Sequence, residues 1–198
     1  PNSFHGMLVS VIGKEPWTRW GRGKSDKDPE LEALASRLLS DRTDFDREMP
    51  WLLSEDAKSS VALGAHLGAI DNDATLLEPL IGSAAKSRYP GLCRGYIKAL
   101  AESHSSNVER INELLDRYQS DAPKFVFDVI STGCASLRPL KRLLSMVDAG
   151  QLPPVYLRGY VYTGGRELAP RELRQVLGRL ITAAHAGDGD AARAALDV

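Results

Sequence analysis

The chain has 198 residues and a formal net charge of −1, and it is 43% hydrophobic and 26% charged. This length suits one domain with a substantial core, and the composition is ordinary for a soluble globular protein. The near-balance of 25 basic and 26 acidic residues excludes a strong overall field that would attract nucleic acid or an anionic membrane.

The N-terminal residues 1–28 are expected to form an irregular segment or cap, followed by a helical domain over residues 29–198. The chain begins with Pro1, and we expect it to be a piece of a larger multidomain protein. Residues 1–16 lack the basic region of a signal peptide, and their apolar stretch at 7–12 suits a strand or a helix equally. No apolar run approaches the roughly 18 residues of a membrane span, so no membrane partner is expected.

A glycine-rich loop, TRWGRGKSD at residues 18–26, comes next and contains Gly23-Lys24-Ser25. A strand, such a loop and then a helix is the order of a nucleotide-binding P-loop. That motif needs a glycine where Thr18 stands, and Pro29 places the next helix too late for its dipole to face a phosphate. We therefore expect no nucleotide and no other cofactor.

Tryptophan alternates with basic residues in the same loop. The rings could stack on nucleic-acid bases while the cations contact phosphates. Alternatively, the tryptophans anchor the loop on the first helical hairpin and the charges lie in solvent. The candidate nucleic-acid or partner-binding residues are Trp17, Arg19, Trp20, Arg22 and Lys24.

Beyond the loop, apolar residues recur at the helical spacing i, i+3, i+4 and i+7. Asp28-Pro29 is typical of a helix start, and late starts or kinks are expected at Pro79 and Pro139. Four of the apolar patterns begin 34, 29 and 33 residues apart, as in stacked helical hairpins. The patterns begin at Leu31, Leu77, Ile111, Leu140 and Leu173, and partner helices are expected in 57–70, 92–103, 124–133 and 155–164.

Two of the partner segments share the tripeptide Arg-Gly-Tyr, at 94–96 and 158–160, separated by 64 residues. The hairpin period and the core spacing make residues 55–198 resemble the HEAT/TPR-like α-solenoid families. The resemblance implies an all-α superhelix of four to five stacked antiparallel hairpins, with a concave surface for interactions.

The repeated tripeptide has two interpretations. In the structural one, tyrosine packs between hairpins and glycine admits a neighbouring helix, as we also expect of Gly64 and Gly68. In the functional one, basic residues two units apart form a ladder that binds an acidic or phosphate-bearing partner. The candidate partner-binding residues are Arg88, Arg94, Lys98 and Arg158.

Catalytic and metal-binding patterns are weak. The four histidines lack a ligand spacing, and the acidic residues 41, 44, 46 and 48 alternate with Arg42 and Arg47, which favours a solvated or salt-bridged face over catalysis. The only cysteines, Cys93 and Cys134, lie far apart, which argues against disulfides and for a reducing compartment, the cytoplasm. We predict a non-enzymatic protein-interaction or scaffolding module without metal or catalytic residues; a nucleic-acid-binding repeat and an enzyme with a scattered site are the alternatives.

Overall fold

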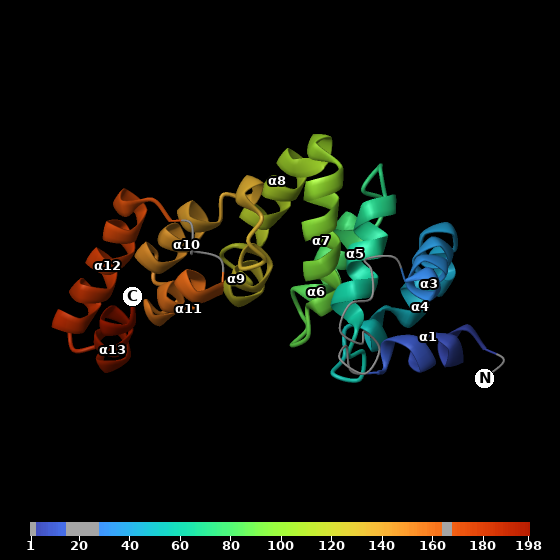
Figure 1. Ribbon diagram of the computed structural model, residues 1–198, viewed down its shortest axis with the longest axis horizontal. Coiled ribbons are helices and arrows are strands. Elements are labelled where there is room, and N and C mark those ends of the chain that lie inside the picture. Colours follow the sequence, from blue (N-terminus) through green and yellow to red (C-terminus); the bar gives the residue numbers. More distant parts are fainter. Residues whose placement is uncertain (1–2, 15–27, 164–167) are drawn as a thin grey trace. The chain divides into compact units, whose positions relative to one another are not determined.

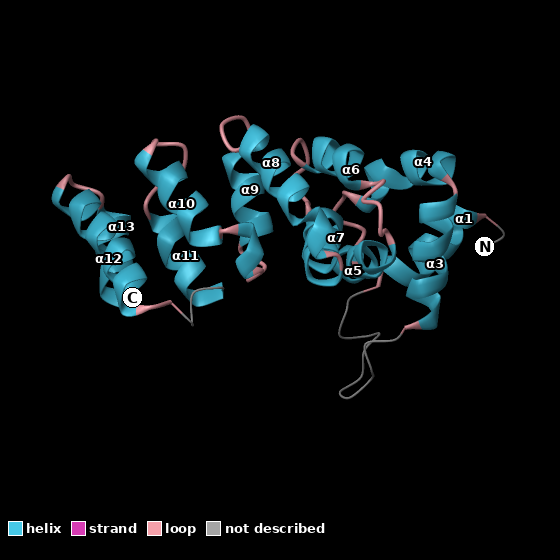
Figure 2. Ribbon diagram, turned by 90° about the horizontal axis from the view of Figure 1, so that it is seen from above, coloured by secondary structure: helices cyan, strands magenta, loops and turns pink. Residues whose placement is uncertain are grey.

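The regular structure of the described residues is helical throughout (Figure 1). The computed structural model describes residues 3–14, 28–163 and 168–198, and within these ranges it contains no strand (Figure 2). The prediction of an all-α fold is confirmed. None of the helices in these ranges is both long enough and apolar enough to cross a membrane.

The internal contacts divide the chain into two compact units, Pro1–Leu115 and Asp116–Val198, which are described separately. Unit 1 contains α1 (Phe4–Ile12), α3 (Pro29–Ser40), α4 (Arg42–Leu52), α5 (Ser60–Ile70), α6 (Leu77–Ala84), α7 (Gly91–Ser103) and most of α8 (Val108–Tyr118). Unit 2 contains α9 (Pro123–Ile130), α10 (Pro139–Asp148), α11 (Val155–Thr163), α12 (Pro170–His185) and α13 (Gly189–Asp197). Short 3-10 turns, Ser105–Asn107 and Ala135–Leu137, precede α8 and α10.

The helix starts follow from capping side chains and prolines. The Asp28 carboxylate accepts hydrogen bonds from the backbone N–H groups of Glu30 and Leu31, and Pro29 occupies the first turn of α3. Pro139 begins α10, and Pro79 lies in the first turn of α6, where its missing N–H leaves no hydrogen bond unmade. The helix start at Pro29 is as predicted from the sequence, whereas α6 and α10 begin at Leu77 and Pro139, so neither helix shows the late start expected at Pro79 and Pro139.

Three segments with strand-like composition are helical. Residues 124–130 lie in α9 and residues 155–162 in α11, although both runs are rich in β-branched and aromatic residues. Their position between the periodic helices predicted this correctly. Residues 7–12 lie in α1, which Ser3 caps by accepting a hydrogen bond from Gly6 N at 3.1 Å.

The core of unit 1 is built on a close crossing of α5 and α7 (Figure 1). A Cβ atom at Gly95 would lie 1.9 Å from the carbonyl oxygen of Val61, and one at Gly64 would lie 2.1 Å from that of Leu92. A Cβ atom at Gly68 would likewise lie 2.2 Å from the carbonyl oxygen of Tyr96. Because these neighbours are backbone atoms, only glycine allows the two helices to approach so closely. The predicted role of glycine is confirmed at these three positions.

Tyr96 ties α7 to the turn before α6. Its hydroxyl donates to Asp71 Oδ2 at 2.6 Å, and the buried Asp71 carboxylate also accepts from Thr75 N and Leu76 N, each at 2.9 Å. Burial, together with the Asp71 hydrogen bond and charge, raises the pKa of the Tyr96 phenol well above its ordinary value. The tyrosine therefore stays a neutral donor and holds the turn in place.

Unit 2 contains two neighbouring helical hairpins, α10/α11 and α12/α13 (Figure 2). Its core is formed by apolar side chains from each of these helices, including Leu143, Leu157 and Val176. Buried Arg142 donates from Nε to the carbonyl oxygen of Leu137 at 3.1 Å and pairs with Asp116. The superhelix of four to five units, the HEAT-like identity and the domain boundary at residue 28 stay predictions.

Candidate partner-binding surfaces

The basic loop predicted to contact nucleic acid or a partner lies outside the described residues. This applies to all five of its candidates, Trp17, Arg19, Trp20, Arg22 and Lys24, and nucleic-acid binding by them stays a prediction. The first described helix after these residues, α3, begins at Pro29 and is capped by Asp28.

Three of the basic candidates belong to unit 1. Arg88 is exposed in the turn before α7, and Arg94 and Lys98 lie one helical turn apart on α7, so they share a face. Lys98 Nζ is 4.0 Å from Glu102 Oε1. Arg94 is partly buried, and its buried Nε has no hydrogen-bond partner among the described residues.

The fourth basic candidate, Arg158, lies on α11 in unit 2 and is engaged within that unit. Its guanidinium pairs with Asp197 Oδ2 at 3.0 Å, and its Cζ lies 5.6 Å from the centre of the Tyr162 ring. These contacts connect α11 to α13. The ladder of Arg94 and Arg158 requires a defined placement of the two units and stays a prediction.

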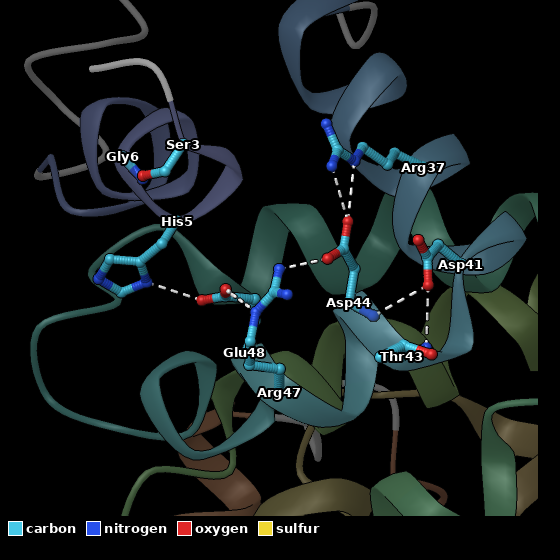
Figure 3. Close-up of polar contacts among 9 residues, drawn as sticks. All are labelled: Ser3, His5, Gly6, Arg37, Asp41, Thr43, Asp44, Arg47 and Glu48. Atoms are coloured by element: carbon cyan, nitrogen blue, oxygen red, sulfur yellow. Dashed lines mark hydrogen bonds and ion pairs between the residues drawn. The ribbon is translucent and has the colours of Figure 1, made fainter.

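The acidic residues of α4 form a chain of charged contacts that joins α1, α3 and α4 (Figure 3). Arg37 donates to Asp44 Oδ2 from Nε at 3.0 Å and from Nη2 at 2.8 Å. Arg47 bridges the two carboxylates, through Nη2 to Asp44 Oδ1 and through Nε to Glu48 Oε1 at 3.1 Å. His5 Nδ1 lies 2.7 Å from Glu48 Oε2. We call these five residues the charged clamp.

The electrostatics of the charged clamp indicate a structural role. Asp44 and Glu48 are only 5% and 3% exposed, and each carboxylate oxygen has an arginine or histidine partner. Burial raises the pKa of Asp44, but the hydrogen bonds and charges of Arg37 and Arg47 outweigh burial and hold it below the ordinary value. Both oxygens of each carboxylate therefore have a basic partner within the fold.

The clamp partly corrects the sequence prediction. The salt-bridged interpretation is right for Asp44 and Glu48, but these two side chains are buried instead of solvated. Their spacing with apolar Phe45, Met49 and Leu52 on one face of α4 is the signal that could have shown this. The partner His5 was missed because it lies 43 residues away from Glu48 in the sequence.

A groove lies between α10 and α12 in unit 2. Its volume is about 710 Å³, and Leu140 and Leu144, one turn apart on α10, give it an apolar floor. Ser145 and Gln175 contribute polar groups to its walls. The sequence pattern identified the two leucines as a helical face, but it gave no sign that part of that face borders a groove.

The ionic side chains that line the groove differ in their pairing. Arg179 donates two hydrogen bonds across it to the Asp148 carboxylate, from Nε at 2.7 Å and Nη2 at 2.6 Å, and this lowers the pKa of Asp148. Glu172 accepts from the backbone N–H of Ala169 at 2.9 Å. Lys141 is exposed and has no hydrogen-bond or ion-pair partner among the described residues. Lys141 and Glu172 thus both line the groove without an ion-pair partner among the described residues.

A smaller pocket of about 300 Å³ lies between α4 and α6 in unit 1. Met49, Pro50, Leu53 and Pro79 supply its apolar lining. At less than half the volume of the α10/α12 groove, it is the weaker candidate for a docked peptide.

Within residues 3–14, 28–163 and 168–198, no three histidine, cysteine or carboxylate side chains gather in a way that could hold a metal ion. Comparisons with protein-family models, with curated proteins and with solved structures find no match for the chain. The geometry of the described surfaces therefore carries the functional argument.

Proposed function

We propose that the chain is a non-enzymatic protein-interaction or scaffolding module that binds a partner protein in the groove between α10 and α12. The groove itself carries this proposal. Its volume of about 710 Å³ falls within the range of roughly 300–1,000 Å³ that is usual for binding pockets. Its lining combines the edges of Leu140 and Leu144, each 8% exposed, with polar and charged side chains from α10 and α12.

The contrast between the paired carboxylates of the charged clamp and the unpaired Lys141 supports the same proposal. The carboxylates of Asp44 and Glu48 are occupied by structural partners in the charged clamp. The Lys141 ammonium, in contrast, lines a groove and pairs with no other described side chain. An exposed cation without an internal partner suits recognition of another molecule better than it suits fold stability.

We further propose that the module works in the cytoplasm, within a larger multidomain HEAT-like protein. Cys93 and Cys134 are buried free thiols, and burial raises the pKa of Cys93 well above its ordinary value. Such inert thiols suit a reducing compartment. The neighbouring hairpins of unit 2 support a helical-repeat architecture.

The proposal is tested with peptides selected from a random display library against the full chain. Peptides of about 16 residues are long enough to form four helical turns. Hydrogen exchange of the complex should show protection in α10 and α12. Ser145→Trp should fill the groove, because Ser145 is exposed and lines it. We expect this change to weaken binding at least ~10-fold, about 1.4 kcal/mol.

Ser120→Trp is the matched control. Ser120 is also exposed in unit 2, and its Oγ accepts a hydrogen bond from Gln151 Nε2 at 3.2 Å. The Oγ of Ser145 accepts a similar bond from Gln119 Nε2 at 3.4 Å. Ser120 does not line the groove, and we expect unchanged binding. Affinity that survives Ser145→Trp, or protection confined to other helices, would contradict the proposed function.

A further inference from the structure

We propose that Arg94 and Lys98 on α7 form a further binding site, which takes a phosphate group carried by a partner protein. The site belongs to unit 1 and does not depend on the groove between α10 and α12, so either proposal can fail alone. Three observations lead to it: the unpaired guanidinium of Arg94, the second cation one helical turn further along α7, and the scarcity of carboxylates on α5 and α7.

The Arg94 side chain is partly buried, yet it makes no hydrogen bond or ion pair with any described residue. Its Nε is fully buried, whereas the Nε atoms of other arginines, Arg37, Arg47 and Arg179, each donate to a carboxylate. Removing a charged donor from water without giving it an acceptor costs free energy. An anion bound at the guanidinium would offset this cost.

The two Nη groups of Arg94 are the part of the guanidinium that an anion can reach. Among the nitrogens of this side chain, Nε alone is both buried and unpartnered, so the Nη groups, which bond to no described residue, are open to solvent. They present their N–H donors as a planar fork that fits two oxygens of one phosphate. Because the inner part of the guanidinium is already held against the fold, less side-chain entropy is lost on binding.

Lys98 supplies the second charge of the site. It follows Arg94 by four residues, so the two side chains leave the same face of α7. Its ammonium lies 4.0 Å from Glu102 Oε1, a long distance for an ion pair, and both side chains are about half exposed. Such a pair is weak in solvent, so Lys98 can turn to a phosphate instead. A phosphate monoester carries about −1.5 to −2 charges near pH 7, which two cations match better than they match one carboxylate.

Few carboxylates of the two central helices oppose an anion at this site. α5, which packs closely on α7, contains no aspartate, glutamate, lysine or arginine. α7 has no acidic residue before Glu102, which lies about two helical turns beyond Arg94. In the turn before α7, exposed Arg88 acts on the neighbouring tyrosine with the opposite sign to Glu55 and Asp56, so the charges there partly cancel. A phosphate at Arg94 is therefore attracted with little repulsion from α5 and α7.

The proposal is tested by an NMR titration of the isotope-labelled full chain, read at the Arg94 Nε–Hε signal, which is assigned by its loss in Arg94→Gln. The probe is a short capped peptide with one phosphoserine between alanine and glycine residues. The same peptide with serine or glutamate at that position is compared at equal ionic strength. We expect a saturable shift with the phosphoserine peptide, weaker binding of the glutamate peptide and no shift with serine. Followed at the remaining signals of α7, Arg94→Gln should weaken binding at least ~10-fold, and Lys98→Gln about 3-fold.

Arg174→Gln is the matched control, because Arg174 is an exposed arginine of α12 in unit 2 and its loss changes the net charge equally. Binding should be unchanged in this variant and in Ser145→Trp. Three results would overturn the proposal: no shift at Arg94 with the phosphoserine peptide, equal affinity for the glutamate peptide, or equal weakening by Arg174→Gln. A single-stranded oligonucleotide that shifts Arg94 where the phosphoserine peptide does not would assign the site to nucleic acid instead. Circular dichroism of each variant establishes that the fold is retained.

Discussion

The two Arg-Gly-Tyr tripeptides lie on helices with very different surroundings. In unit 1, Gly95 meets the backbone of α5, and the Tyr96 hydroxyl is bonded to buried Asp71. In unit 2, a Cβ at Gly159 would meet only Phe127 Cζ, at an ordinary 3.5 Å, and the Tyr160 hydroxyl bonds to no described residue. The same three residues therefore fasten helices tightly in one unit and loosely in the other.

The difference extends to the charges of the two units. Unit 1 contains the charged clamp, which joins α1, α3 and α4 and whose two carboxylates are buried while its basic side chains are about half exposed. In unit 2 the pair between Arg179 and Asp148 is partly exposed and borders a groove, although Arg142 is buried. The comparison indicates that buried polar contacts hold unit 1 together, while in unit 2 the pair beside the groove is open to solvent, as the proposed partner-binding role requires.

The largest expected effect separates the two glycines. Gly95→Ala forces α5 and α7 apart, and we expect it to lower the free energy of unfolding of unit 1 by about 3 kcal/mol. Gly159→Ala has room for its methyl group and should stabilise α11 by about 0.5 kcal/mol, because glycine is a poor helix former. Urea unfolding of the full chain, with hydrogen exchange to assign each unit, measures both changes. Effects of the same sign would refute the comparison.

The second-largest expected effect is a difference in stability loss between Tyr96→Phe and Tyr160→Phe. Tyr96→Phe leaves the buried Asp71 carboxylate without one of its donors, which should cost about 2 kcal/mol of stability. Tyr160→Phe removes a hydroxyl that no described residue bonds, and its effect should stay below about 0.5 kcal/mol. Thermal unfolding of the two variants makes the comparison. Equal losses would show that the Asp71 bond does not anchor unit 1.

Acid should weaken the charged clamp. The pKa of Asp44 is lowered in the folded protein, so the stability it contributes is present above the carboxyl pKa of the unfolded chain, roughly 3.9. This stability is lost as the pH falls through the folded pKa. Between about pH 5 and pH 3, wild-type unit 1 should therefore lose more stability than the Asp44→Asn variant loses.

Asp46→Asn serves as the control for the acid prediction. Asp46 pairs with Arg42 at 2.9 Å, but both side chains are about half exposed, so the pair is screened by solvent. This variant should keep the wild-type slope of stability against pH. A slope that is flat in the wild type, or equally reduced in both variants, would show that the clamp does not stabilise the folded state.

The smallest effect is expected in unit 2. Asp148→Asn removes the partly exposed ion pair with Arg179, which should cost at most about 1 kcal/mol and less at high salt. Urea unfolding at two ionic strengths measures it. A loss as large as that of Tyr96→Phe would mean that unit 2 is held together by charge as firmly as unit 1.

Local rules predicted the helices well and the surfaces poorly. Asp28-Pro29 and the apolar spacing of Leu140, Leu143 and Leu144 depend on near neighbours in the sequence, and the structure agrees with them. Gly95 is closely packed against a neighbouring helix and Gly159 is not, and this difference depends on which residues lie opposite each glycine. The tripeptide itself carries no such information.

The candidate sites show the same limit. Arg94 and Arg158 are candidates because they share a tripeptide, yet Arg158 pairs with Asp197 of α13, which lies far along the sequence. The groove depends on α10 and α12 lying next to each other, and its bridging pair joins residues 31 positions apart. Single-sequence patterns give no signal for such pairings.

The most direct test of the proposed partner-binding groove is a methyl NMR titration of the full chain with a peptide selected from the display library. We predict chemical-shift changes concentrated on the methyl groups of Leu140 and Leu144, with Met49 and Leu53 of the smaller pocket unchanged. Shifts at Met49 and Leu53 instead, or no shift at Leu140 and Leu144 at saturating peptide, would contradict the account.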